Sequence, residues 1–125
     1  MKAKIYHHHT DCGQVVYYAT YLEFLERART EFLAEKGIDV KELMEKGNFF
    51  VVSRQELDYK LPIRYGDIIE VKTVINGVSA VRIDLGHKIE NSSGVVAVEA
   101  RTILAFVDKN FKPKAMPDHL REDLT

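Results

Sequence analysis

The sequence lacks most of the features that stabilise small secreted proteins or anchor proteins in membranes. Only one of its 125 residues, Cys12, is a cysteine, which excludes an intrachain disulfide and is typical of a reducing compartment. No run of about eighteen apolar residues occurs, so no transmembrane helix is expected. The first residues also lack the apolar run of a secretory signal. We therefore predict a cytoplasmic protein.

Long runs of one charge, internal repeats and low-complexity segments are missing as well. The chain mixes 18 basic with 19 acidic residues, for a net charge of −1, so nucleic acid is not expected as a partner. A content of 46% hydrophobic and 30% charged residues is ordinary for a folded protein. The length predicts a single domain over residues 1–125. A domain of this size leaves apolar surface that an oligomer can bury.

One long amphipathic helix is the strongest local pattern. Apolar residues recur every three or four positions over residues 21–33, opposite a polar face. Thr20 is the predicted N-cap, and Glu23 completes a capping box with it. Gly37 is expected to end the helix.

The rest of the chain is patterned mainly as strands. A short strand is expected over residues 2–9, and a short helical turn over residues 40–46. Alternating apolar and polar residues predict further strands, with turns at Asn76-Gly77 and over residues 91–94. These strands span residues 48–58, 68–75, 81–89 and 95–107, and the tail beyond them is expected to be an irregular exit segment. Because one helix must cover one face of the sheet, the predicted fold is α+β, with a curved antiparallel sheet wrapped around the helix.

A carboxylate lies just before the long helix. Asp11 and Gly13 occupy a predicted loop over residues 11–18. A helix start presents unpaired backbone N–H groups and a partial positive charge, so it can hold an anion or a developing oxyanion. A carboxylate beside such a site can attack a carbonyl held there, or activate water against it. The sequence leaves both roles open, and the alternative is an aspartate that only caps a turn.

Three consecutive histidines and the lone cysteine flank this carboxylate. In a strand, His7 and His9 share one face and His8 points the opposite way, so two histidines with Asp11 are a conceivable zinc site. No His-Glu-x-x-His or paired-cysteine spacing supports a metal, and none is predicted. One or two of the histidines are instead expected to line a pocket and to hydrogen-bond Asp11 or substrate. The carboxylate beside Cys12 opposes thiolate formation, so this thiol is interpreted as structural.

Two motifs resemble those of a known family. The run Thr10-Asp11-Cys12-Gly13-Gln14-Val15-Val16-Tyr17-Tyr18-Ala19-Thr20-Tyr21, followed by residues 24–31, is similar to a motif of the hotdog-fold acyl-CoA thioesterases. The segment Leu57–Asp67 and the long final strand match the same group, in the same order and over nearly the whole chain. The chain resembles the 4-hydroxybenzoyl-CoA thioesterase-like group and, within it, the YbgC-type acyl-CoA thioesterases. The resemblance implies a hotdog fold and hydrolysis of an acyl-CoA thioester to free acid and coenzyme A.

The resemblance also implies roles for particular residues. Asp11 becomes the catalytic carboxylate, and backbone N–H groups near Tyr17 and Tyr18 polarise the thioester carbonyl. Active sites are implied to form between subunits of a homodimer or homotetramer, with no cofactor beyond the coenzyme A of the substrate. Two positions depart from the pattern, because many close relatives carry histidine where this chain has Tyr18 and tyrosine where it has His7. Both remain candidate catalytic residues beside Asp11.

Further residues are candidates for contact with the substrate. Gln14 is a candidate for polar contact near the thioester, the tyrosines line an acyl or aryl pocket or belong to the core, and cationic side chains meet the coenzyme A phosphates. The candidate substrate-binding residues are Gln14, Val16, Tyr17, Lys60, Arg64, Arg82 and Lys88. Hydratases and dehydratases of this fold need a histidine five residues after the aspartate, where this chain has Val16, so that chemistry is disfavoured. A non-catalytic module that binds acyl-CoA or acyl carrier protein stays open as the alternative.

Overall fold

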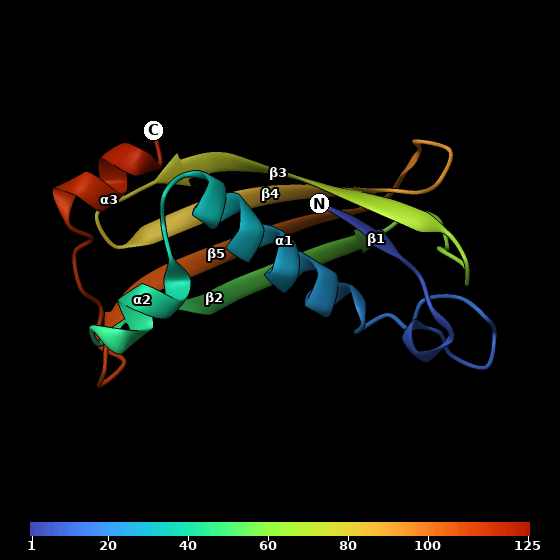
Figure 1. The fold of residues 1–125 in the computed structure, drawn as a ribbon, viewed down its shortest axis with the longest axis horizontal. Helices are drawn as coiled ribbons and strands as arrows, with labels where there is room; N and C mark the ends of the chain where they lie inside the picture. Colours follow the sequence, from blue (N-terminus) through green and yellow to red (C-terminus); the bar gives the residue numbers. More distant parts are fainter.

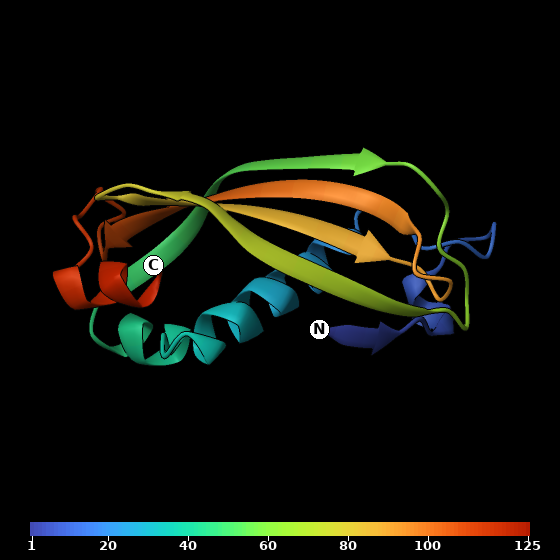
Figure 2. The same ribbon diagram turned by 90° about the horizontal axis from the view of Figure 1, so that it is seen from above.

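The computed structural model describes residues 1–125, in which one antiparallel sheet curls around a long helix (Figure 1 and Figure 2). The strand order is β1-β3-β4-β5-β2, and every neighbouring pair is antiparallel. The predicted α+β architecture is thereby confirmed. In chain order the elements are β1 (Lys2–Lys4), the 3₁₀ helix η1 (His7–His9), α1 (Tyr21–Glu35), α2 (Val40–Glu45), β2 (Asn48–Tyr59), β3 (Ile68–Val78), β4 (Arg82–Glu90), β5 (Val96–Asp108) and α3 (Asp118–Asp123).

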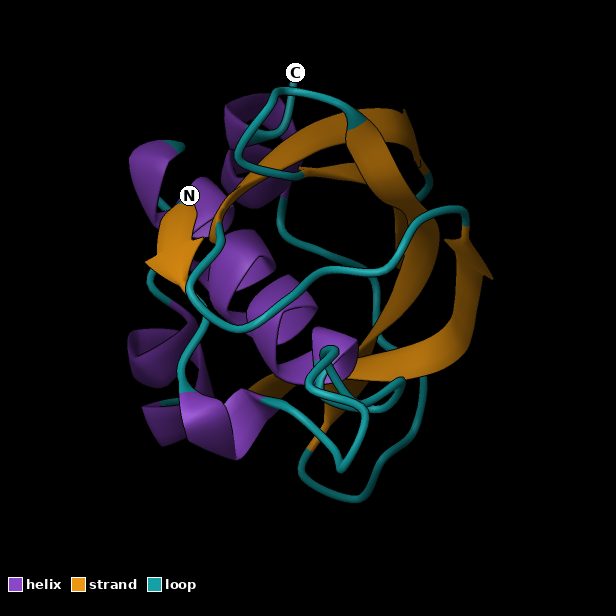
Figure 3. Ribbon diagram, turned by 90° about the vertical axis from the view of Figure 1, so that its right-hand side faces the viewer, coloured by secondary structure: helices purple, strands orange, loops and turns teal.

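Helix α1 lies against the concave side of the sheet (Figure 3). Its apolar stripe is buried there, through Tyr21, Phe24, Leu25, Ala28 and Leu33. The helix begins where the sequence predicts, and Gly37 adopts the expected left-handed conformation just beyond its end, with φ of 85°. The capping-box prediction is wrong. Thr20 has helical backbone angles and its side chain makes no cap hydrogen bond; the N–H groups of Leu22 and Glu23 donate instead to the carbonyls of Ala19 and Thr20.

The histidine segment forms a turn instead of the predicted strand. Only Lys2–Lys4 pair with β3, and His7–His9 form η1. The Tyr6 N–H donates to Nδ1 of His9 at 2.9 Å, and Oγ1 of Thr10 donates to the His7 carbonyl at 2.7 Å. These local side-chain bonds compete with the sheet ladder and curl the chain. The two histidines therefore share no strand face, and no group of three or more metal-ligating side chains occurs.

One of the two predicted turns is also misplaced. Strand β3 runs through Asn76-Gly77 to Val78, and a shift in pairing register near Gly77 accommodates the extra residue as a bulge. The chain reverses after it, where Oγ of Ser79 accepts the N–H of Arg82. The turn over residues 91–94 is confirmed, because Oδ1 of Asn91 accepts the N–H groups of Ser93 and Val95 across it.

The tail contains a helix that the sequence pattern did not predict. Leu120 and Leu124 are four residues apart, so they share one face of α3 and its C-terminal flank. Both are buried with Met116 in the core cluster at the far end of α1. The charged residues around these two leucines outnumber them, so the sequence pattern shows no clear amphipathic helix there. No helix of the structure is both long and apolar enough to cross a membrane.

A polar layer divides the core into two apolar clusters. His87 lies between them on β4 and is only 3% exposed. Its ring nitrogens contact Oγ1 of Thr73 at 3.0 Å and Oγ1 of Thr102 at 3.3 Å. The Thr102 hydroxyl donates to Gln55 at 2.8 Å, so its oxygen is left to accept the Nε2–H of His87. The buried imidazole is therefore held neutral, with Nδ1 accepting from Thr73.

Candidate functional site

The carboxylate loop is a tight hairpin anchored to a distant segment. Thr10 pairs with Val16 across it, and the Gln14 N–H donates to the Asp11 carbonyl at 3.0 Å. On its outer side Val15 pairs with Arg64. Asp11 and Gln14 are consequently the first and last residues of one turn, in a fixed position before α1.

Asp11 is exposed, and only one of its carboxylate oxygens is occupied. Its Oδ1 accepts the Gly13 N–H at 2.8 Å, which is the turn-capping role considered as the alternative. A Cβ at residue 13 would lie 3.2 Å from that oxygen, so glycine relieves crowding there. The second oxygen accepts no hydrogen bond from the chain. Asp11 can therefore cap its turn and still offer one oxygen to a ligand.

Unpaired N–H groups lie in the turn just before α1, close to where the sequence predicts. The Tyr17 N–H donates to the His9 carbonyl at 3.0 Å, and the Thr20 N–H donates to the Tyr17 carbonyl at 2.9 Å. The N–H groups of Tyr18 and Ala19 donate to no acceptor in the chain. The free donors in the turn before α1 are thus those of Tyr18 and Ala19, whereas that of Tyr17 is already used.

Two adjacent tyrosines border these donors. The rings of Tyr17 and Tyr18 are 4.6 Å apart between centroids, and both are exposed. The Tyr18 hydroxyl raises the pKa of Tyr17, and the Asp11 carboxylate adds to this effect. At neutral pH the Tyr17 phenol therefore keeps its proton and can donate a hydrogen bond.

A third tyrosine, at the end of β2, hydrogen-bonds the backbone of the segment that holds Tyr18 and Ala19. The Tyr59 hydroxyl donates to the Tyr18 carbonyl at 2.8 Å, and burial raises the pKa of Tyr59. This contact joins residues 41 positions apart, so no local sequence signal points to it. The peptide that follows Tyr18, whose N–H is the free donor of Ala19, is thereby held in place.

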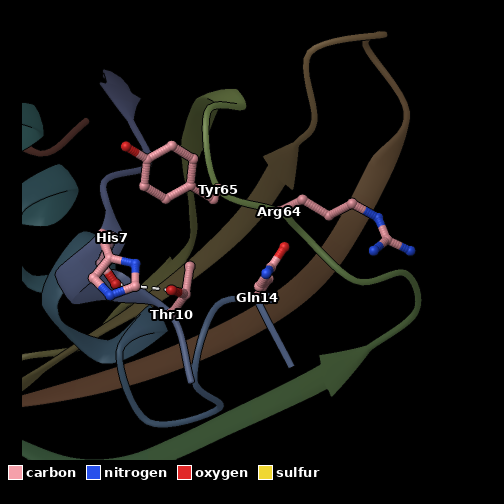
Figure 4. Close-up of a pocket in the computed structure, with 5 residues that line it drawn as sticks. All are labelled: His7, Thr10, Gln14, Arg64 and Tyr65. Carbon is pink, nitrogen blue, oxygen red and sulfur yellow. Dashed lines mark hydrogen bonds between the residues drawn. The ribbon is translucent and has the colours of Figure 1, made fainter. Parts of the chain in front are cut away.

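A cavity of about 390 Å³ lies beside the carboxylate loop (Figure 4). It is lined by His7, Thr10, Gln14, Arg64 and Tyr65, so it brings together three residues predicted from sequence. The His7 ring meets Tyr65 edge-on, with centroids 6.0 Å apart. Sequence reasoning missed Thr10 and Tyr65, although each directly adjoins a predicted residue. Asp11 lies on the adjoining loop and does not line the cavity.

The remaining predicted contacts lie elsewhere. Val16 is 5% exposed in the apolar core, so its side chain is not available to a substrate. Lys60 is near two carboxylates, Asp58 at 3.5 Å and Glu99 at 4.0 Å. Arg82 and Lys88 lie on the face of β4 opposite α1, because the residues that alternate with them are buried against the helix. Arg82 is the first residue of β4, and β4 begins at the α3 end of the sheet, away from the loop that precedes α1 (Figure 2).

Known proteins share both the sequence and the fold. The sequence model of the thioesterase-like superfamily matches residues 6–124. The acyl-CoA thioester hydrolase YbgC of Escherichia coli O157:H7 is 34% identical over 115 residues, covering 91% of this chain and 86% of that protein. The solved structure of a probable thioesterase from Bartonella henselae is 31% identical with a TM-score of 0.86, covering 94% of this chain and 97% of that one. The solved structure of a DHNA-CoA thioesterase from Staphylococcus aureus is 25% identical with a TM-score of 0.89, covering 92% of this chain and 78% of that one.

Proposed function

This chain belongs to the thioesterase-like superfamily, and from that membership we propose that it hydrolyses an acyl-CoA thioester to a free carboxylic acid and coenzyme A. Its fold is the hotdog fold, with the curved sheet around α1. Within the structure, one observation supports the proposal. Asp11 keeps a free carboxylate oxygen on a hydrogen-bonded turn, and the unpaired N–H groups of Tyr18 and Ala19 lie in the turn just before α1.

In the proposed reaction the thioester carbonyl oxygen accepts hydrogen bonds from the Tyr18 and Ala19 N–H groups. These donors stabilise the negative charge that develops on this oxygen, and one such donor typically contributes a factor of ~10²–10³ in rate. The free oxygen of Asp11 either attacks the carbonyl carbon and expels the coenzyme A thiolate, or takes a proton from an attacking water. In the first case water then cleaves the acyl–aspartyl anhydride. Both routes end in the same products.

We propose further that the working enzyme is a homodimer or homotetramer with active sites between subunits. In the single chain Asp11 and Tyr18 are exposed, so a second surface is needed to exclude water from a reacting thioester. Strand β2 is an edge of the sheet. Val52 on this strand and Leu22 on α1 line one groove, and their side chains are 45% and 43% exposed. An open edge with apolar neighbours is suited to pairing with another copy. Light scattering measures the resulting mass directly.

Hydrolysis itself is tested with purified protein and a panel of acyl-CoA thioesters, with the released thiol as the readout. Turnover of at least one thioester supports the proposal. Tight binding of acyl-CoA without turnover across the panel would instead support a non-catalytic binding module. The panel also reports the preference for acyl or aryl groups.

Arg64 is expected to bind a phosphate of coenzyme A. Its guanidinium is exposed beside the cavity and makes no ion pair within the chain. We expect Arg64→Gln to raise KM for acyl-CoA about tenfold at low salt, with kcat unchanged, because a charge-assisted hydrogen bond contributes about 1.5 kcal/mol. The corresponding acyl-pantetheine carries no phosphate, so its KM is expected to stay the same.

The matched control for this measurement is Arg121→Gln. Arg121 is an exposed arginine on α3, at the other end of the molecule. Its replacement should leave both KM values unchanged. An Arg64→Gln variant that binds acyl-CoA and acyl-pantetheine equally poorly would contradict a phosphate contact.

A further inference from the structure

Gln14 holds a backbone conformation that glycine adopts more easily. Its φ is 63°, and the only other non-glycine residue with positive φ is Phe111. Gln14 is the last residue of the Asp11 turn, and hairpin loops commonly place glycine at such a left-handed position. A side chain at positive φ costs stability, and residues kept in such conformations cluster at functional sites.

The strained backbone places an unused amide at the cavity. The Gln14 N–H donates to the Asp11 carbonyl, and its carbonyl accepts the Tyr65 N–H at 3.3 Å, so both ends of the residue are held. Its side chain lines the cavity and makes no hydrogen bond within the chain. In Figure 4 this amide lies between Thr10 and Arg64, whose guanidinium extends away from the cavity. Gln14 therefore presents a free donor and a free acceptor beside the carboxylate loop.

We propose that the Gln14 side chain hydrogen-bonds an amide of the pantetheine arm of acyl-CoA, which rests on the proposed function. The ends of a tight turn lie within about 7 Å of each other, so a thioester held at Asp11 has its sulfur substituent within reach of Gln14. That substituent is the pantetheine arm, whose secondary amides need both a donor and an acceptor, and a glutamine amide supplies both. Gln14 thus recognises the thiol carrier, whereas the acyl group is recognised elsewhere.

The test compares Gln14→Gly with the wild type on three thioesters of one acyl group. We expect kcat/KM to fall about tenfold for acyl-CoA and for acyl-pantetheine, as for one lost hydrogen bond. The S-ethyl thioester has no amide, so its kcat/KM is expected to be unchanged. An equal loss with the S-ethyl thioester would mean that the loop had moved Asp11, and would overturn the proposal. Full activity on all three thioesters would overturn it as well.

Stability gives a second readout with a matched control. Glycine adopts the left-handed backbone without strain, so Tm of Gln14→Gly is expected to rise by about 2–4 °C. Phe111→Gly makes the same change at the other left-handed residue, which is 71% exposed in the turn after β5. The kcat/KM of Phe111→Gly should equal that of the wild type for all three thioesters. A fall in Tm of Gln14→Gly would contradict the strain at this position.

Calorimetric binding of free pantetheine separates this proposal from the proposed function. We expect Gln14→Gly to bind pantetheine about tenfold more weakly than the wild type, whether or not a thioester is hydrolysed. A wild type that hydrolyses no thioester refutes the enzymatic function. Equal pantetheine affinities in the two proteins refute the Gln14 contact.

Discussion

Replacing Asp11 with asparagine is expected to lower kcat for acyl-CoA hydrolysis about 10³-fold, because an amide neither attacks a thioester nor takes a proton from water. The fold should be almost unaffected, with a change of about 0.5 kcal/mol or less in the free energy of unfolding. The reason is local. The only hydrogen bond of the Asp11 side chain is the one from the Gly13 N–H to Oδ1, and an asparagine oxygen accepts it equally well. Thiol release and urea unfolding measure the two quantities.

Asp108→Asn is the matched control for this substitution. Oδ1 of Asp108 also caps a turn, accepting the N–H groups of Asn110 and Lys112 beyond β5. That turn is at the other end of the molecule from the Asp11 loop (Figure 1). We expect the kcat of Asp108→Asn to match that of the wild type. If Asp11→Asn kept full activity, the assignment of Asp11 as the catalytic carboxylate would be wrong.

First-turnover kinetics distinguish the two possible roles of Asp11. A nucleophile forms an acyl-enzyme, so coenzyme A is released in a burst before the free acid. A general base activates water in a single step, so both products appear together. Rapid quenching within one turnover, with separate detection of thiol and acid, decides between them.

Acid is expected to destabilise the fold by about 3 kcal/mol between pH 7 and pH 4 through His87 alone. Burial, helped by the positive charge of Arg29, lowers the pKa of His87 from 6.5 to about 4 in the folded protein. Between these values the unfolded chain binds a proton that the folded chain does not. The contribution is therefore fully present above pH 6.5 and is lost as the pH falls toward 4.

The surroundings of His87 supply no anion to offset this effect. Its ring nitrogens contact the hydroxyls of Thr73 on β3 and Thr102 on β5, and the only charge that shifts its pKa is that of the cation Arg29 on α1. An imidazolium in this layer would be desolvated beside a guanidinium. The neutral ring is thus the only form that the polar layer accommodates at low cost.

Urea unfolding of the wild type and of His87→Gln at several pH values tests this expectation. The variant loses hydrogen bonds and is less stable at pH 7, but its free energy of unfolding should approach that of the wild type as the pH falls toward 4. Asp84, whose pKa the Arg101 side chain lowers, contributes equally to both proteins and cancels. His119→Gln, at an exposed histidine of α3, should keep the wild-type slope. Parallel pH profiles for the wild type and His87→Gln would contradict the role of His87.

Local patterns in the chain were sufficient for much of the fold. The apolar stripe of α1 and the alternation of β4 each belong to one continuous segment. Each predicts its element correctly because a helix or strand buries whichever of its faces is apolar. Local signals that compete with one another were less reliable. Asn76-Gly77 signals a turn, yet pairing with β4 carries the strand past it, and His7–His9 leave β1 because side-chain bonds replace the ladder.

The same division holds at the site. The sequence was enough to single out Asp11 before a helix start, because both the loop and the amphipathic period that follows it are contiguous. The cytoplasmic location, the single domain and the lack of a cofactor stay predictions. Tertiary structure alone decided which distant segments hold the Asp11 loop and the start of α1 in place: Val15 pairs with Arg64, and the Tyr59 hydroxyl donates to the Tyr18 carbonyl. Such contacts join segments that are tens of residues apart, so they depend on how the whole sheet curls around α1, and no pattern within either segment records them.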